Sequence, residues 1–271
     1  MKEAAFFDLD KTVIARASMA AFGLPMYKEG LISRRTILRA IYAQFIYMHL
    51  GASEEKLARI RDSALALAKG WDRERVRTIV AETLERVVDP IVYAEALELI
   101  SEHRAAGRTV VIVSASPEEI VVPLSKYLGF DDVIATRARV DDRGRYSGEM
   151  EFYAYGPFKA AAIRAMAARD GIDLDRSFAY SDSYTDVPML EAVGQPVAVN
   201  PDRVLLKLAR EREWEVRNFT RSVRLRERVS MPTTPVTVGI GIAGLLGAAA
   251  LVLWKTGLRQ RRRSPSISSA A

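Results

Sequence analysis

The sequence predicts an α/β protein with a parallel β-sheet, and three observations define its organisation. Short apolar runs alternate with helical patterns through most of the 271 residues, as in sheets whose strands are joined by helices. The stretch 19–89, which follows the first apolar run, contains no convincing strand and has a helical pattern instead. An uncharged run at 236–254 comes after the alternation is complete. We therefore expect a sheet domain, a helical insert and a separate C-terminal segment.

The individual elements follow from the apolar runs and from the residues that begin and end helices. The first strand is predicted over 4–9. Helices of the insert are expected to begin near residues 33, 53 and 72 and to end near 51, 70 and 89. Later helices are expected to begin near 90, 116 and 156. The remaining strands are predicted at 108–114, 132–136, 177–180 and 196–199, with a small hairpin at 139–152.

The composition is that of a globular protein and excludes several kinds of site. Hydrophobic residues make up 49% and charged residues 27% of the chain, which is enough apolar material for a sizeable core. The chain has no cysteine, so disulfides, thiolate metal sites and a cysteine nucleophile are excluded. The two histidines, His49 and His103, lie far in sequence from other candidate ligands, and both are expected on helix surfaces.

The net charge of +6 conceals a division of the chain. Residues 203–271 carry 14 Lys and Arg against 4 Asp and Glu, a net charge of +10. The preceding 202 residues carry 26 against 30, a net charge of −4. The basicity is therefore a property of the C-terminal part, and the body gives no reason to expect a nucleic-acid surface.

The uncharged run at 236–254 predicts a membrane helix. As a helix it would span roughly 28 Å against a hydrocarbon core of about 30 Å, so one span fits. A basic linker at 218–235 precedes it, and a basic, disordered tail is expected at 255–271. Because arginines flank the run on both sides, a helix lying on anionic lipid is the alternative to a full span, and a buried Gly/Ala-rich helix is a third possibility. The first residues predict no secretory signal, so the body is expected to face the cytoplasm.

The segment after the first strand carries the most informative motif, Asp8-Leu9-Asp10-Lys11-Thr12. Two carboxylates at the exit of an apolar strand would repel each other and be poorly solvated unless a cation held them. Oxygen ligands of this kind suit a hard divalent ion, and Mg²⁺ is the natural choice. The alternative is that both acids merely cap a turn.

Four further polar residues stand at predicted strand ends or in the helix just after. Ser114 ends the strand at 108–114, and Lys159 lies in the first turn of the helix expected from residue 156. Asp182 and Asp186 follow the strand at 177–180. In open α/β sheets this edge is where ligands bind. The sequence therefore predicts one site assembled from these residues together with the first motif.

This set of residues, in this order, resembles the haloacid dehalogenase (HAD) superfamily of phosphatases, and more closely its phosphoserine phosphatase-like branch, subfamily IB. The resemblance covers residues 4 to about 217. It implies a Rossmann-like catalytic core formed by 1–14 and 90–217, with 15–89 as a helical cap domain.

The resemblance also implies a role for each site residue. Asp8 would be the nucleophile and Asp10 the general acid and base, whose pKa we expect to be raised by crowding with other carboxylates. Asp8 and Asp182 would bind Mg²⁺ through their carboxylates and Asp10 through its backbone carbonyl. Asp186 would hold a metal-bound water or orient Lys159. The phosphoryl oxygens would be bound by Thr12, Ser114 and Lys159.

Two features depart from the family pattern. Ser181 and Ser183 flank Asp182 where many members have glycines, and both are small enough to keep that loop tight. Serine-selective members carry a glutamate shortly after the first motif, whereas residues 15–20 contain no acid here. Recognition of phosphoserine is thereby put in question, and Arg16 would favour a more anionic substrate.

The sequence thus predicts a Mg²⁺-dependent phosphomonoester hydrolase tethered to a membrane by its C-terminal helix. Its substrate would be a small phosphomonoester such as phosphoserine, or a lipid-linked phosphate. Two alternatives stay open: a phosphotransferase or mutase with the same aspartyl-phosphate, and a membrane-bound binding protein without activity. The intact Asp8 and Asp10 argue against the last.

Overall fold

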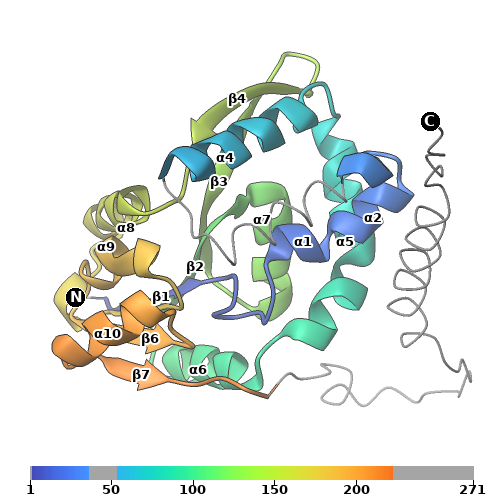
Figure 1. Ribbon diagram of the computed structural model, residues 1–271. Helices are drawn as coiled ribbons and strands as arrows, with labels where there is room; N and C mark the ends of the chain where they lie inside the picture. Colours follow the sequence, from blue (N-terminus) through green and yellow to red (C-terminus); the bar gives the residue numbers. More distant parts are fainter. Residues whose placement is uncertain (1, 37–53, 222–271) are drawn as a thin grey trace, which may run out of the picture. The chain divides into compact units, whose positions relative to one another are not determined.

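The predicted α/β class is confirmed by the computed structural model, which describes residues 2–36 and 54–221 (Figure 1). Seven strands form one sheet in the order β4-β3-β2-β1-β5-β6-β7. The bounds are β1 Ala4–Asp8, β2 Thr109–Pro117, β3 Asp132–Val140, β4 Tyr146–Phe152, β5 Phe178–Ser181, β6 Gln195–Val199 and β7 Glu215–Arg217. All neighbours pair in parallel except β3 and β4, which are antiparallel. The fully buried β1 therefore lies at the centre of a mostly parallel sheet.

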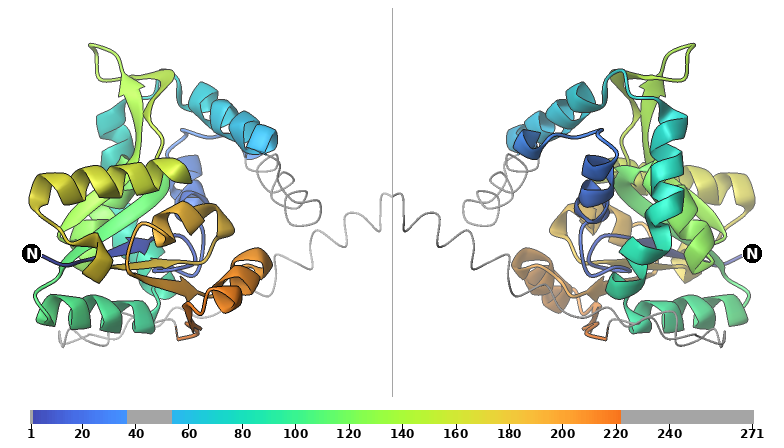
Figure 2. Two further views of the ribbon diagram at one scale, coloured as in Figure 1. Left: turned by 90° about the vertical axis from the view of Figure 1, so that its left-hand side faces the viewer. Right: turned by 90° about the vertical axis from the view of Figure 1, so that its right-hand side faces the viewer.

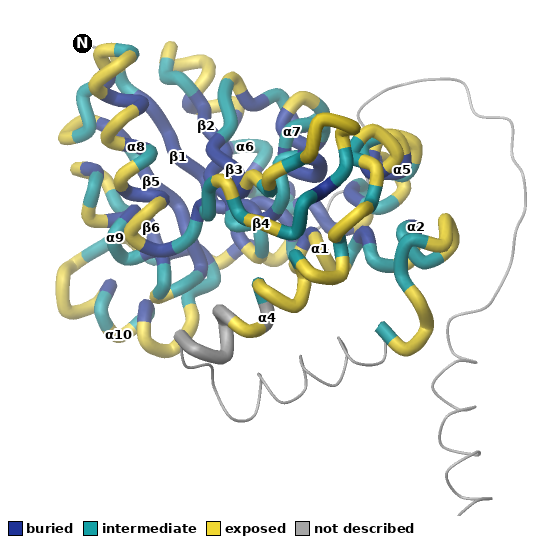
Figure 3. Tube along the Cα trace, turned by 90° about the horizontal axis from the view of Figure 1, so that it is seen from above, coloured by how far each residue is buried: buried dark blue, intermediate teal, exposed yellow. Residues whose placement is uncertain are grey.

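Helices cover both faces of the sheet, and the alternation of side chains along β1 explains why. Phe7 faces the core under α6 (Ala94–Ala105) and α7 (Glu118–Leu128), whereas Phe6 faces the core under α8 (Pro157–Asp170), α9 (Val187–Leu190) and α10 (Arg203–Glu211). Figure 2 shows α6 and α8 on opposite sides of the strands, and Figure 3 shows the buried residues concentrated in the strands between them. Because both faces of the central strands are buried, those strands are apolar without interruption.

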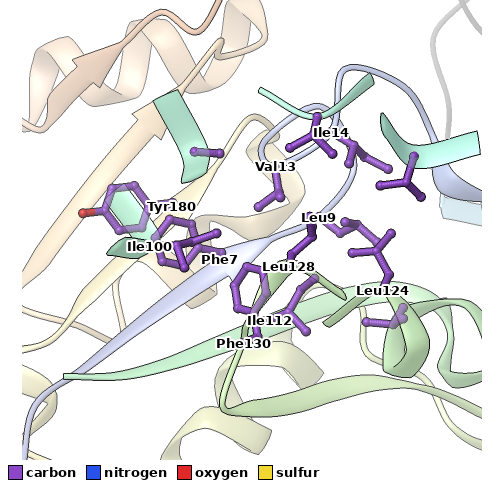
Figure 4. Packing of buried hydrophobic residues seen from close by; sticks show 14 of the residues in the cluster. Phe7, Leu9, Val13, Ile14, Ile100, Ile112, Leu124, Leu128, Phe130 and Tyr180 are labelled. Atoms are coloured by element: carbon purple, nitrogen blue, oxygen red, sulfur yellow. The ribbon is translucent and has the colours of Figure 1, made fainter. Parts of the chain in front are cut away.

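Phe7 occupies the middle of the first core. Its ring stacks on Tyr180 at a centroid distance of 4.4 Å and meets Phe130 edge to face at 5.8 Å (Figure 4). These aromatic contacts join β1, the strand that ends in Asp8, to β5 and to the segment after α7.

The described residues between β1 and β2 are helical, as predicted, with small differences in the helix boundaries. The structure places α4 at Glu54–Ala68 and α5 at Arg73–Val88, followed by a 3₁₀ turn, η1, at Asp89–Ile91. The Asp72 side chain caps α5 by accepting a hydrogen bond from the Arg75 backbone N–H. Two short helices, α1 (Ser18–Ala21) and α2 (Gly23–Lys28), were not predicted. The helix expected from residue 33 is described only at its start, over 34–36.

Several other boundaries need correction. The predicted short strand 132–136 and the first half of the predicted hairpin form one continuous strand, β3, because its pairing with β2 passes directly into its pairing with β4. The helix expected at Ser116 begins only at Glu118, since β2 extends to Pro117. Two further 3₁₀ turns lie at η2 (Leu174–Arg176) and η3 (Tyr184–Asp186). The edge strand β7 was not expected at all.

The expectation that His103 lies on a helix surface is wrong. His103 is buried where α6 packs on the sheet, and its Nε2 lies 2.7 Å from the Tyr180 hydroxyl. Its ring also packs against Phe7 and Phe178. Burial lowers the pKa of His103 to about 4, so the ring is neutral at physiological pH.

No helix within residues 2–36 and 54–221 is both long and apolar enough to cross a membrane. The predicted membrane segment 236–254 lies outside the described residues, as do His49, most of the linker 218–235 and the tail 255–271. The chain divides into two compact units at residues 229 and 230, and the described residues all belong to the first.

Candidate active site

The parallel strands bring three of the predicted residues to one edge of the sheet. Asp8 ends β1, and its Cα partner on β2 is Val113, the residue before Ser114. On the other side Phe7 pairs with Tyr180, so the end of β1 also lies beside Ser181 and the loop that begins with Asp182. This arrangement follows from the strand register, since all three strands run in the same direction and the residues that follow their paired positions meet at one edge.

Lys159 joins the nucleophile candidate to the loop after β5. Its Nζ donates hydrogen bonds to Asp8 Oδ1 at 2.6 Å and to Asp186 Oδ2 at 2.7 Å, and the Ser181 hydroxyl donates to the same Asp186 oxygen at 2.8 Å. The ammonium is buried. Burial by itself would lower the pKa of Lys159, but Asp186 and Asp8 reverse the effect and raise it, so this lysine stays charged.

The start of α8 explains how Lys159 reaches so far. Gly156 precedes the helix with a φ of 53° and a ψ of −127°, a conformation that side chains disfavour, and Pro157 then begins the helix with its φ already suitable. Lys159 thereby enters the first turn, from which its side chain extends to the strand ends.

Two of the acids, Asp8 and Asp182, are buried and poorly solvated. Burial raises the pKa of Asp8 well above its usual range, and nearby carboxylates add to this while Lys159 opposes it. Burial likewise raises the pKa of Asp182 to about 7, opposed by Lys11, whose Nζ lies 3.8 Å away but is largely exposed. Asp8 therefore shares its buried cation, Lys159, with Asp186, and Asp182 is paired only with the exposed Lys11.

Asp10 is held by two serines that were not predicted as site residues. The Ser18 backbone N–H donates to Asp10 Oδ1 at 2.8 Å, and the Ser116 hydroxyl donates to Asp10 Oδ2 at 3.2 Å. The pKa of Asp10 is raised, as expected, but burial is the main cause rather than carboxylate crowding, and the serine hydrogen bonds act against it. In the sequence these two serines are marked only by their small size and their positions, Ser18 in the segment after β1 and Ser116 near the end of β2.

Thr12 and Ser114 are buried beside these acids, and the hydrogen bonds within the described residues leave part of their hydroxyl capacity unused. Thr12 Oγ1 is fully buried, and among the described residues it has no hydrogen-bond partner. Ser114 Oγ accepts one bond, from the Ser116 backbone N–H at 3.1 Å, and its proton remains available. An unpaired buried hydroxyl is costly, so an oxygen-rich ligand at this position would satisfy Thr12.

The charges at this edge favour a cation. Four carboxylates, those of Asp8, Asp10, Asp182 and Asp186, face a single buried ammonium, Lys159. No cluster of three His, Cys, Asp or Glu side chains arranged for a metal occurs in the part of the chain that the structure describes. The carboxylates of Asp8 and Asp182 and the Asp10 backbone carbonyl are oxygen donors that could hold a hard cation such as Mg²⁺ together with solvent oxygens.

The sequence matches the family model of haloacid dehalogenase-like hydrolases over residues 5–191, which is more than half of the chain. The chain belongs to this family. The protein is accordingly a hydrolase of the HAD superfamily.

Individual proteins are similar to this chain over most of its length. The chain is 50% identical to the "inhibition of morphological differentiation protein" of Streptomyces azureus over 96% of this chain and 95% of that protein. It is 36% identical to a phosphoserine phosphatase of Mycobacterium tuberculosis over 89% of this chain and 77% of that protein. A solved structure of a Bordetella pertussis protein of unknown function superimposes with a TM-score of 0.70 at 26% identity, covering 80% of this chain and 98% of that one.

Proposed function

We propose that this HAD hydrolase is a Mg²⁺-dependent phosphomonoesterase that acts through an aspartyl-phosphate on Asp8. The observation that carries the proposal is the ion pair of Asp8 with the buried Lys159 at the sheet edge. A second acid, Asp10, follows two residues later and is held separately by hydrogen bonds. A carboxylate with one oxygen fixed by an ammonium presents its other oxygen for attack.

In the first step, Asp8 attacks the phosphorus atom, an O–P bond forms, and the bond from phosphorus to the leaving oxygen breaks. Asp10 gives its proton to that leaving oxygen. In the second step, Asp10 takes a proton from water, whose oxygen attacks the phosphorus of the aspartyl-phosphate. The Asp8–phosphoryl bond then breaks, which releases inorganic phosphate and restores both acids.

The phosphoryl oxygens are assigned to Thr12, Ser114 and Lys159. The buried, unpartnered hydroxyl of Thr12 and the free proton of Ser114 are neutral donors, and Lys159 supplies positive charge where negative charge builds up. Mg²⁺, when bound, would neutralise charge on the phosphoryl group as a Lewis acid, held by Asp8, Asp182 and the Asp10 carbonyl. Asp186 positions Lys159 through its 2.7 Å ion pair and is assigned a place beside the metal site, outside the direct ligands.

The helical stretch 15–89 is proposed as the cap over a core formed by 1–14 and 90–217. The substrate is proposed to be a small phosphomonoester, such as the phosphoserine in the name of the Mycobacterium relative, or a lipid-linked phosphate. The absence of any acid in 15–20, together with the exposed Arg16, favours a leaving group that is anionic over one that presents an amine. The segment 236–254 is proposed to hold the cytoplasmic catalytic domain on a membrane.

The test is the substitution Asp8→Asn, which keeps the shape of the side chain and removes the nucleophile. Purified Asp8→Asn should retain less than about 1% of the wild-type rate of phosphate release with Mg²⁺ present, because little else at the site can replace a covalent nucleophile. Asp142→Asn, in the exposed hairpin turn, is the matched control and should keep full activity. Substantial activity in Asp8→Asn would refute the covalent route, and transfer to an added alcohol in place of phosphate release would indicate a phosphotransferase.

A further inference from the structure

The end of β2 is irregular at the position where it approaches Asp10. Pairing between β2 and β3 slips between Ser114 and Pro117, so the two residues between them lack regular partners on β3. Irregularities of this kind redirect a side chain that regular pleating would place elsewhere. Ser116 lies in the slipped segment, is 5% exposed, and directs its hydroxyl to Asp10 Oδ2 at 3.2 Å.

A second serine, Ser18, contacts the same carboxyl group from the segment that follows β1. Ser18, in α1, donates its backbone N–H to Asp10 Oδ1 at 2.8 Å, and its hydroxyl lies 2.6 Å from the Ser116 hydroxyl. Either hydroxyl can donate in this contact. The result is a continuous set of hydrogen bonds that joins Ser18, Ser116 and the Asp10 carboxyl group.

The two contacts on Asp10 differ in what they can do. A backbone N–H can only donate, so the Ser18 bond occupies Oδ1 and leaves Oδ2 as the oxygen that carries a proton. The Ser116 hydroxyl can donate to a lone pair of Oδ2 whether or not that oxygen carries the proton meant for the leaving group, so Ser116 can hold the same side-chain orientation before and after proton transfer. Together they restrain both oxygens of a group that must act at one defined place.

We propose that Ser116 and Ser18 are positioning residues for Asp10: they fix its carboxyl group toward the leaving oxygen, and Ser18 makes that orientation depend on the helical segment after β1. The proposal rests on the proposed function, since it needs Asp10 to be the proton donor. Neither serine touches the phosphoryl group in this scheme. Their effect is on proton delivery alone.

The consequence is a dependence on the leaving group. An alkoxide is a poor leaving group and needs a proton as the bond to phosphorus breaks, whereas p-nitrophenolate leaves with little assistance. Loss of positioning should therefore slow hydrolysis of an alkyl phosphate far more than hydrolysis of p-nitrophenyl phosphate. A purely structural defect would slow both substrates alike.

The experiment compares kcat/KM of the full chain on glycerol phosphate and on p-nitrophenyl phosphate, with Mg²⁺ present. Ser116→Ala should lower the glycerol phosphate value about 10- to 100-fold and the p-nitrophenyl phosphate value less than about 3-fold, because general acid catalysis as a whole contributes roughly 10²- to 10⁴-fold. Ser18→Ala keeps the backbone bond and should cause a smaller loss with the same substrate selectivity. Ser116→Thr retains the hydroxyl and should recover most of the rate.

Two comparisons make the result decisive. Ser125→Ala removes a buried hydroxyl that bonds to the Val122 carbonyl in α7, away from Asp10, and should change neither substrate. Asp10→Asn removes the proton donor itself, so it gives the largest difference between the two substrates that loss of proton delivery can cause. If Asp10→Asn is selective and Ser116→Ala slows both substrates equally or neither, the positioning role is refuted while the proposed function stands. If Ser116→Ala does not fold, Ser18→Ala and Ser116→Thr are compared on the two substrates instead, and equal effects on both substrates again refute the role. If Asp10→Asn itself shows no selectivity, the proposed acid role fails.

Discussion

At the scale of single residues, Asp182 offers the most direct test of the proposed metal site. It is nearly buried at the end of β5, and its closest cation, Lys11, is exposed. Replacing it with alanine removes one of two carboxylate ligands proposed for Mg²⁺. We expect Asp182→Ala to raise the Mg²⁺ concentration for half-maximal activity at least about tenfold. A magnesium titration of activity measures this, with Asp142→Ala as control, and an unchanged midpoint or full activity in excess chelator would contradict the assignment.

His103 gives a prediction for stability that does not involve the site. Its pKa in the folded protein is about 4, below the ordinary value of 6.5, so between these values the unfolded chain takes up the proton first. The stability due to neutral His103 is complete above pH 6.5 and is lost as the pH falls toward 4. From about pH 7.5 to about pH 4.5 the loss should be about 2 kcal/mol.

Chemical denaturation of wild type and His103→Gln at both pH values isolates this contribution. Glutamine keeps a polar group near the Tyr180 hydroxyl but does not titrate, so the fall in unfolding free energy should be smaller in the variant. Equal pH dependence in the two proteins would show that His103 takes no part in it.

The residues of the proposed site divide clearly into those that the sequence could indicate and those that it could not. Asp8, Ser114 and Asp182 follow apolar strands, and parallel strands bring such positions together whatever the rest of the chain does. Ser18 and Ser116 contact each other across 98 residues, and that contact depends on the irregular end of β2. A local pattern carries no information on a contact of this kind.

At the scale of elements, helices and strands with a clear hydrophobic pattern were predicted, and very short ones were not. The central strands are apolar runs buried on both faces, and each was located to within a few residues. The strand β7 has only three residues, Glu-Val-Arg, and forms because β6 offers it an open edge to pair with. The helices α1 and α2 have 4 and 6 residues, too few for a helical period to be visible.

Helix α5 is fixed to α7 by ionic contacts that also test the proposed cap. Arg73, in the first turn of α5, donates Nε to Glu119 Oε1 at 2.9 Å and also pairs with Glu118. Glu119 is buried, so removal of the arginine would leave a buried acid without its cation. We expect Arg73→Ala to lower the free energy of unfolding by about 2 kcal/mol.

Denaturant titrations of Arg73→Ala and of Arg139→Ala provide the measurement and its control. Arg139 pairs with Glu149 on the exposed hairpin, where both side chains are solvated, and its loss should cost less than about 0.5 kcal/mol. A cost for Arg73→Ala no greater than that of Arg139→Ala would mean that this network does not hold α5 in place.

At the scale of the whole molecule, the chain joins a family hydrolase to a C-terminal segment of different character. The family match ends at residue 191, and the described fold ends with β7 and the short stretch after it, to residue 221. There Arg221 donates its backbone N–H and side chain to Glu95 of α6, and its carbonyl accepts from the Ala94 N–H. These contacts attach the last described residues to the catalytic body.

Deletion of residues 230–271 tests whether the rest of the chain serves as a membrane anchor. The compact unit that contains every proposed site residue ends at Val229, so the deletion leaves its core contacts intact. The only uncharged run long enough to cross a bilayer, 236–254, lies inside the deleted part.

We expect the truncated protein to move from the membrane fraction to the soluble fraction and to hydrolyse p-nitrophenyl phosphate at the wild-type rate. A lipid-linked substrate in vesicles should be hydrolysed more slowly, because enzyme and substrate no longer share a surface. Retention on membranes after a high-salt wash, or loss of the fold, would show instead that 236–254 is not the anchor and that the deleted residues support the catalytic body.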